Sequence, residues 1–368
     1  MIVLTMSVRK AKASFFKQKF ASCSSNYKRF WDTVKSMENK STSSQLPTAL
    51  RLGNTVTTDK SMIIEMFNKH FSTAGHAFLL TTPTPANSSA SPAATRPSLP
   101  SFSFTQIQTA NVLKELQIKS AGLDNLDPLF LKLSAAIVAT PITSLFNLSF
   151  VSSEIPKYWN AAAVIPLFKG GDTLDPNCYI PISILPCLSK VFESQVNKQI
   201  TDHFESHRTF SAVQSGFRAG HGCTSATLKV LNDILTAIDK RQYCAAVFID
   251  LAKAFDSVNH RILISRLNSL GFSNDCLAWF TNYFADRVQC VKSEGMLSGP
   301  LAVSMGVPQG SILGPTLFSV YINDVALAAG DSLIHLYADD TILYISGPSL
   351  DTVLTNLQTS FDAIQHSD

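Results

Sequence analysis

Tyr337-Ala338-Asp339-Asp340 lies between two apolar runs, Leu333 to Leu336 and Thr341 to Ile345. Gly330 precedes the first run, and Gly347-Pro348 follow the second. This pattern predicts a β-hairpin that carries two carboxylates at its tip. Adjacent aspartates repel each other, and Asn-Gly or Asp-Gly would reverse the chain at lower cost. A bound divalent cation would offset that repulsion, although an acidic turn exposed to solvent has the same pattern.

A second apolar strand favours the metal interpretation. The run from Ala246 to Ile249 ends at Asp250. If the strands are neighbours, Asp250, Asp339 and Asp340 lie together at strand ends and can hold two Mg²⁺ ions. Such a metal pair clamps the attacking and leaving oxygens of a phosphoryl transfer. Asp256 comes just before an expected helix, and we interpret it as a helix cap rather than a metal ligand.

Length and composition describe a globular protein with few charges. The chain has 368 residues, of which 45% are hydrophobic and 15% are charged, which is enough for two or three units with cores of their own. The net charge is only +3, but the basic residues within 1–40 far outnumber Asp32 and Glu38; they are Arg9, Lys10, Lys12, Lys17, Lys19, Lys28, Arg29, Lys35 and Lys40. A basic arm suggests nucleic-acid binding, and a solvated charged helix also explains it.

The cysteines and the N-terminus indicate an intracellular protein that is not secreted. The seven cysteines are scattered, and none forms a CxxC pair or a zinc-spaced cluster with histidine, so we expect reduced thiols. The apolar start, Met1 to Met6, is too short for a signal peptide. The segment Leu133 to Ser153 is uncharged, but Pro141 favours a buried helix pair broken at that proline over a membrane span. The choice between nucleus and cytoplasm stays open.

Shifts in composition divide the chain into four parts. We expect a basic helical region over 1–78, a Pro-, Ser-, Thr- and Ala-rich linker over 79–103, a mostly helical segment over 104–240, and a strand-containing segment over 241–368. In the first part Trp31, Val34 and Met37 stand at helical spacing. In the last part an apolar helix is predicted from Ile312 to Leu327.

Three segments in this order carry a family resemblance: AVFIDLAKAFDSVNH (246–260), GVPQGSILGPTLFSVYINDV (306–325) and YADDTILY (337–344). They resemble the palm of reverse transcriptases of the non-LTR (LINE-type) retrotransposon class. Upstream, KSAGLDNLDPLFLKL (119–133), VIPLFKGGDTLDPNCYIPISIL (164–185) and QSGFRAGHGCTSATL (214–228) resemble the fingers of the same family. The resemblance covers the chain from about Phe104 to the end.

The resemblance implies a fold and an activity. The fold class is α/β: a right-hand polymerase palm over 241–368, with an antiparallel sheet backed by helices, and largely helical fingers over 104–240. The implied activity is RNA-directed DNA polymerisation, in which a primer 3′-OH attacks a dNTP with two Mg²⁺ ions, or Mn²⁺ in their place. The expected partners are an RNA template, a DNA primer and dNTP, without a membrane.

The same resemblance assigns roles to residues around the metal site. Asp250 and Asp339 are implied metal ligands with Asp340 beside them, and Phe255 is an implied steric gate against a 2′-hydroxyl. Without the flanking motif, Phe255 would be an ordinary core residue. The gate argues against the rival activity of an RNA-dependent RNA polymerase, which must accept ribonucleotides. Tyr337 is assigned to nucleic-acid contact.

Further residues are assigned to the nucleotide and the nucleic acid. Gln309 offers an amide to the nucleotide or template, and Gly306 and Gly310 let the backbone approach a ligand closely. Lys169 can reach a triphosphate as a point charge. Arg218 can hold template phosphate or brace the fingers. For both Lys169 and Arg218, a solvated surface charge is the alternative.

The sequence departs from the family pattern in three ways. Ile180 stands where the family pattern has an arginine that contributes to triphosphate binding. The chain ends soon after an amphipathic segment at Leu350 to Ile364, so we expect that the thumb and the next palm motif are absent. No endonuclease domain is expected before Phe104. A fragment of a mobile element fits these departures, and so does the alternative of a catalytically inactive nucleic-acid-binding relic.

Overall fold

The computed structural model describes residues 13–15, 17–21, 33, 46–53, 55–75, 98–99, 101–117 and 121–366. The chain divides into two compact units, Met1–Gln45 and Leu46–Asp368. In the first unit the described residues are helical. The predicted helix around Trp31, Val34 and Met37, most of the basic arm and most of the 79–103 linker lie outside the described residues.

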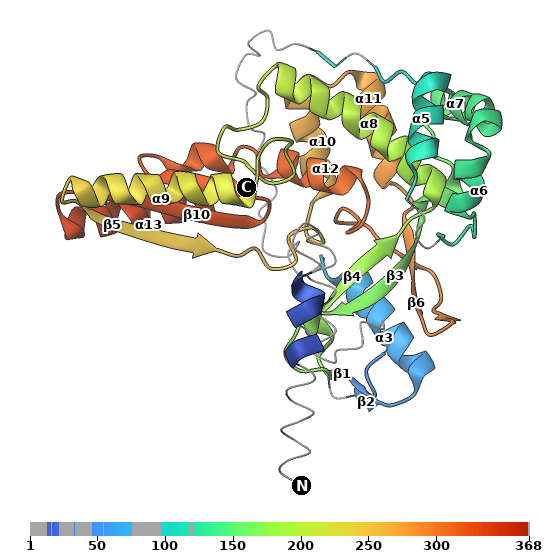
Figure 1. Cartoon of the computed structure of the whole chain (residues 1–368), viewed down its shortest axis with the longest axis horizontal. Coiled ribbons are helices and arrows are strands. Elements are labelled where there is room, and N and C mark those ends of the chain that lie inside the picture. The colour runs from blue at the N-terminus through green and yellow to red at the C-terminus, as the bar shows by residue number, and fades with distance from the viewer. Residues whose placement is uncertain are drawn as a thin grey trace. The chain divides into compact units, whose positions relative to one another are not determined.

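A three-stranded antiparallel sheet contains the hairpin and the Asp250 strand (Figure 1). Its strands, in spatial order, are β5 (Tyr243–Ile249), β10 (Asp340–Gly347) and β9 (Leu333–Tyr337). Thr341 pairs with Ile249 across β10 and β5. The prediction that the two aspartate-bearing strands are neighbours is therefore confirmed.

Two helices cover the two faces of this sheet. Successive side chains of a strand point to opposite faces, and Leu343 packs in a cluster with Leu357 of α13 (Leu350–Gln365). The next residue, Tyr344, donates its hydroxyl to Asp233 of α9 (Cys223–Asp239) at 2.7 Å. The sheet thus lies between α13 and α9.

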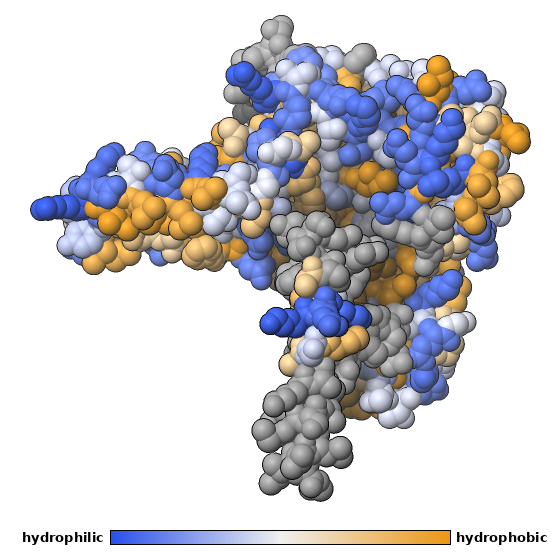
Figure 2. All heavy atoms as spheres, in the orientation of Figure 1, coloured by the Kyte–Doolittle hydropathy of each residue, from blue (hydrophilic) through white to orange (hydrophobic). Residues whose placement is uncertain are grey.

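The outer side of α9 is apolar although it faces solvent. Figure 2 shows hydrophobic residues exposed along the part of the molecule that α9 and β5 form. Four exposed residues recur on α9 at spacings of three and four, and Phe248 of β5 is 81% exposed; the four are Leu228, Leu231, Leu235 and Ile238. An exposed apolar stripe on a helix is unusual for a solvent-facing surface.

A second sheet carries the segment around Lys169 and Ile180. Its main strands are β4 (Tyr179–Ile184), β3 (Ala161–Phe168), β6 (Val288–Ser293) and β7 (Met296–Leu297), and β8 (Leu301–Ala302) pairs with β6. Strands β3 and β6 are parallel, whereas β3 and β4 are antiparallel. Helix α3 (Lys60–Thr73) packs Ile64, Phe67 and Phe71 against Val164 and Val291 of this sheet. The short strands β1 (Leu50–Leu52) and β2 (Thr55–Thr57) lie in a region for which the sequence had predicted only helices.

The largest core is built by helices and is rich in aromatic residues. Phe146 and Phe192 stack with ring centroids 4.5 Å apart, and Trp279 meets Phe192 edge-on at 5.4 Å. The helices are α5 (Gln106–Glu115), α6 (Pro128–Leu133), α7 (Ala135–Ser152), α8 (Cys187–Ser206), α10 (His260–Ser269), α11 (Asn274–Phe284) and α12 (Leu313–Tyr321). The described residues also form three short 3₁₀ segments, which are η1 (Lys157–Asn160), η2 (Pro176–Cys178) and η3 (Val325–Ala329).

Two predictions about helices are wrong in detail. The α6–α7 pair is broken at Ser134, and Pro141 lies inside α7. Proline has no amide hydrogen, so the carbonyl of Ile137, four residues earlier, loses its usual helical donor. Ile137 lies on the exposed side of the helix, where water can donate to that carbonyl instead. The helix expected from Ile312 to Leu327 ends at Tyr321 and is followed by η3. By length and composition α7 would suffice to cross a membrane, but its inner side packs Ala139 and Phe146 into the main core.

Candidate active site

The two aspartates occupy the tip of the β9–β10 hairpin, as predicted. Tyr337 pairs with Asp340, so Ala338 and Asp339 form a two-residue turn. Ala338 has a φ of 58°, which an L-residue with a side chain rarely adopts and which two-residue hairpin turns demand. The half-buried Tyr337 stands at the last position of β9; its contact with nucleic acid stays a prediction.

Asp250 lies at the same end of the sheet as the hairpin tip. It follows Ile249, whose partner on β10 is Thr341, so continuing the register brings Asp250 alongside Asp340. Burial raises the pKa of Asp339, and the negative charges of Asp340 and Asp250 raise it further. The charges of Asp250 and Asp340 therefore act on the Asp339 carboxylate, and the binding of metal by the three residues stays a prediction.

This donor set fits a divalent cation that is shared with a substrate. Within the described part of the chain, no three His, Cys, Asp or Glu side chains form a ready-made metal cage. Mg²⁺ is commonly held by one or two carboxylates together with substrate phosphates. The all-oxygen donors at the strand ends suit that mode of binding, and a cation there would relieve the repulsion that raises the pKa of Asp339.

The ring of Phe255 is held from two sides. It stacks on Phe318 of α12, with centroids 4.7 Å apart and planes at 17°, and Phe217 meets it edge-on at 6.0 Å. The side chain is half-buried against the main core. A ring fixed in this way suits a rigid steric gate, and its selection against ribonucleotides stays a prediction.

The glycines of the GVPQG loop lie against the protein's own backbone, and their approach to a ligand stays a prediction. A Cβ on Gly306 would lie 2.9 Å from the Phe255 carbonyl oxygen, and one on Gly310 would lie 2.5 Å from the Ser183 carbonyl oxygen. Both glycines also have positive φ, 83° and 116°. The close approach that they permit is thus to the protein's own backbone, beside the gate on one side and β4 on the other.

Asp256 is not a helix cap, contrary to the prediction. Asn259 caps α10, whereas both carboxylate oxygens of Asp256 accept from Gln309 Nε2 at 3.3 Å. Burial raises the pKa of Asp256 to about 6, although the Gln309 hydrogen bond and Lys253 lower it. The Gln309 amide is therefore oriented by a half-buried acid that lies 53 residues away in the sequence.

A small pocket lies beside the Gln309 amide. Its lining combines residues from α3, from β4, from the segment around Phe255 and from the GVPQG loop. Among them are Ser72, Ser183, Asp256, Gly306 and Gln309. Gly75, which follows α3, approaches so closely that a Cβ there would lie 2.5 Å from the Asp256 carbonyl oxygen. The structure thus brings Gly306 and Gln309 together with residues that the sequence had not singled out.

Lys169 and Ile180 face the same way on the β3–β4 hairpin. Leu167 pairs with Ile180, and the Lys169 amide donates to the Cys178 carbonyl at 2.9 Å, so pairing continues beyond β3. Because side chains alternate along a strand, Lys169 lies on the face of Leu167 and Ile180. The Lys169 side chain is exposed; its contact with a triphosphate stays a prediction.

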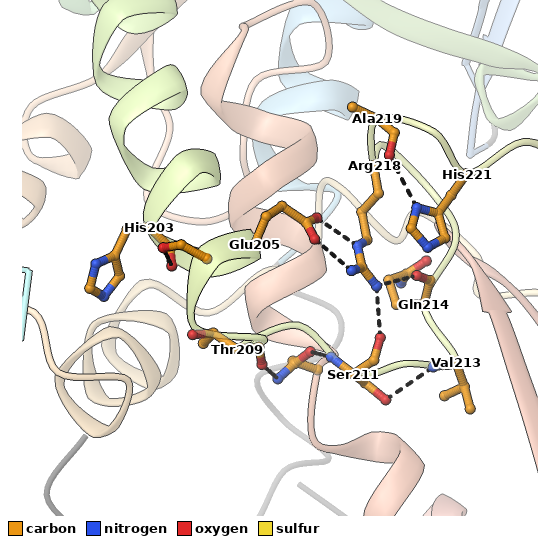
Figure 3. A network of polar contacts seen from close by, with 11 residues as sticks. His203, Glu205, Thr209, Ser211, Val213, Gln214, Arg218, Ala219 and His221 are labelled. Carbon is orange, nitrogen blue, oxygen red and sulfur yellow. Dashed lines mark hydrogen bonds and ion pairs between the residues drawn. The ribbon is translucent and has the colours of Figure 1, made fainter. Parts of the chain in front are cut away.

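Arg218 braces its own segment, which is one of the two roles predicted for it. Figure 3 shows its guanidinium against the Glu205 carboxylate, with Nε and Nη2 each donating at 2.8 Å. Nη1 donates to the carbonyls of Ser211 and Gln214, both at 3.0 Å. Four of its five N–H groups are used in this way, which leaves little for template phosphate.

The comparisons with known proteins agree with the mixed α/β fold. A family model described as reverse transcriptase (RNA-dependent DNA polymerase) matches residues 169–367, more than half of the chain. The chain belongs to this reverse transcriptase family, whose polymerase palm accounts for the sheet and which generally uses divalent metal ions.

Named relatives are proteins of insect mobile elements. The chain is 33% identical over 276 residues to a probable RNA-directed DNA polymerase from transposon BS of Drosophila melanogaster, covering 71% of this chain and 30% of that protein. It is 31% identical over 277 residues to the RNA-directed DNA polymerase from mobile element jockey of the same species, covering 73% and 30%. The chain thus spans about 30% of the length of the curated relatives it matches.

Proposed function

We propose that this chain is the polymerase part of a non-LTR retrotransposon reverse transcriptase, and that it adds deoxynucleotides to a DNA primer while copying RNA. The observation that carries the proposal is the cluster of Asp250, Asp339 and Asp340 at neighbouring strand ends, where burial and then the charges of the other two raise the pKa of Asp339. The family match and the likeness to RNA-directed DNA polymerases of mobile elements support it.

Asp250 and Asp339 would hold two Mg²⁺ ions, or Mn²⁺ in their place, together with the triphosphate of the incoming nucleotide. When bound, the ions favour ionisation of the primer 3′-OH and neutralise charge on the leaving pyrophosphate. The fixed ring of Phe255 excludes a 2′-hydroxyl by its position. Exposed Lys169 attracts the triphosphate as a point charge.

The test is primer extension on an RNA template with the four dNTPs and Mg²⁺. The wild-type chain is expected to extend the primer, Asp339→Asn to fall to background, and Asp331→Asn to match the wild type. Asp331 is an exposed acid in the turn before β9 and is therefore a suitable control. Extension by Asp339→Asn at the wild-type rate would refute the catalytic assignment.

One observation favours a second candidate, a nucleic-acid-binding relic without polymerase activity. Ile180 offers no hydrogen-bond donor at a position that shares its face with Lys169. The relic would bind a primer–template but fail to extend it, even with Mn²⁺. A filter-binding measurement on the same samples separates this outcome from a chain that binds no nucleic acid.

A further inference from the structure

The edge of β9 is covered by the segment just before Arg218. The Leu336 amide donates to the Val213 carbonyl at 2.9 Å, and the Ser215 amide donates to the Leu336 carbonyl at 2.8 Å. These two bonds form a parallel bridge between Gln214 and Leu336. The segment therefore extends the catalytic sheet on the side opposite β5, two residues from the turn that carries Asp339.

Gln214 reaches from this segment into the catalytic turn. Its side chain is fully buried, and its Oε1 accepts from the Gly216 amide at 2.7 Å and the Ala338 amide at 3.2 Å. Ala338 is the residue at positive φ directly before Asp339. The two backbone donors fix which way the Gln214 amide points, and they leave Nε2 without a partner among the described residues. A buried donor without a partner is costly, so this glutamine is not explained by packing alone.

Gly216 lies directly on the backbone of the same turn. A Cβ at this position would lie 2.1 Å from the Ala338 nitrogen and 2.8 Å from the Ala338 Cα. Real Cβ atoms do not approach so closely, and the atoms in the way belong to backbone rather than to a flexible side chain. Any side chain at 216 must therefore displace the turn that carries Asp339.

We propose that Gln214 and Gly216 are positioning residues for Asp339: they fix the Ala338 backbone and thereby the place of the metal-binding carboxylate. This inference rests on the proposed function and names residues that act through the hairpin. The next residue, Phe217, contacts the gate ring of Phe255. One short segment thus supports both the carboxylate and the sugar gate.

The absence of charge on the Gln214 side chain matters as much as its acceptor oxygen, Oε1. A glutamate would accept from the same two amides, but its charge would lie against Ala338, in the turn that already carries the carboxylates of Asp339 and Asp340. A methionine has nearly the same shape and no comparable acceptor. The two substitutions therefore separate loss of the hydrogen bonds from added charge.

The experiment compares amide hydrogen exchange at Ala338, Mn²⁺ binding by electron paramagnetic resonance, and primer extension, all in the full chain. In Gln214→Met we expect exchange at Ala338 to speed up about tenfold, as loss of one hydrogen bond implies. Mn²⁺ binding is expected to weaken. Because a displacement of about 1 Å costs about a hundredfold in rate, kcat should fall about ten- to a hundredfold, with little change in the dNTP KM.

Gln214→Glu should restore slow exchange at Ala338 without restoring kcat. Gly216→Ala should resemble Gln214→Met, whereas Gly222→Ala should behave as the wild type, because a Cβ on Gly222 meets open space in the same loop. If Gln214→Met shows the wild-type exchange rate at Ala338 and the wild-type affinity for Mn²⁺, the proposal is overturned. Because Gln214→Met adds no clash with the turn, it keeps the test valid even if Gly216→Ala does not fold. If the wild type itself extends no primer, the proposed polymerase function fails, but exchange and Mn²⁺ binding still decide this inference.

Discussion

Replacing Asp256 by asparagine should stabilise the protein at neutral pH. The side chain is half-buried beside Gln309, and this burial raises its pKa from an ordinary 3.8 to about 6. Asparagine keeps the shape and one acceptor oxygen for the Gln309 amide, and it carries no charge at any pH. The substitution therefore removes the cost of burying a carboxylate while it preserves a hydrogen bond.

The magnitude follows from the shift in pKa. Because the folded-state pKa is raised, the native protein binds the proton more tightly than the unfolded chain, and stability is lost as pH rises from the unfolded pKa through the folded one. A shift from 3.8 to about 6 is roughly two pH units, which at about 1.4 kcal/mol per unit gives about 3 kcal/mol. Nearly all of this loss should fall between about pH 4 and pH 7, and Asp256→Asn should not show it.

The assay is urea unfolding of both proteins from about pH 4.5 to pH 8, with the difference in unfolding free energy plotted against pH. We expect Asp256→Asn to gain over the wild type as pH rises and to level off above about pH 7. Asp331→Asn, at an exposed position, should give a flat difference. A flat difference for Asp256→Asn, or one that falls with pH, would refute the burial argument.

Three further predictions test the remaining assignments. Phe255→Val should admit ribonucleotides in primer extension and leave Mn²⁺ binding intact; unchanged sugar discrimination would return Phe255 to the ordinary core. Ile180→Arg should lower the dNTP KM by about one to two decades, because a charged hydrogen bond is worth about 1.5–3 kcal/mol. If Lys169→Ala impairs the enzyme but Ile180→Arg leaves the KM unaltered, position 180 does not face the triphosphate. Neutralising five residues of the basic arm should flatten the dependence of RNA affinity on salt concentration, since fewer counterions are released on binding. If the dependence on salt is unchanged, the arm is only solvated. The five residues are Arg9, Lys10, Lys12, Lys17 and Lys19.

The features that local sequence determines were predicted well. The hairpin with Asp339 at its tip and the strand before Asp250 both follow from apolar runs bounded by turn residues. Strand β3, Ala161–Phe168, likewise coincides with an unbroken apolar run. Apolar alternation and turn residues act over a few neighbouring positions, so a single sequence reports them directly.

The pairing of the two aspartate-bearing strands was predicted, but other features that depend on distant contacts were not. Asp256 precedes a helix, and sequence position alone suggests a cap; its partner Gln309 is 53 residues away. Gly306 and Gly310 signal a close approach, but the sequence does not say that the neighbour is Phe255 or Ser183 rather than a ligand. Gln214 stands in a segment that was recognised as a motif, but only the fold reveals its contact with Ala338.

The GVPQG loop shows why such contacts matter for the site. Within the loop, the Gln309 amide donates to half-buried Asp256. Just beyond the loop, the Ile312 amide at the start of α12 donates to Glu193 Oε2 at 2.7 Å, and Tyr283 donates its hydroxyl to Glu193 Oε1 at 2.9 Å. Glu193 is 2% exposed, and burial raises its pKa. A negative group at a helix N-terminus is favourable, whereas burying an acid is costly. Asp256 and Glu193, which come from separate elements, thus hold the loop in place at a cost in stability. The position of Gln309 therefore depends on the fold of the whole unit and not on the GVPQG motif alone.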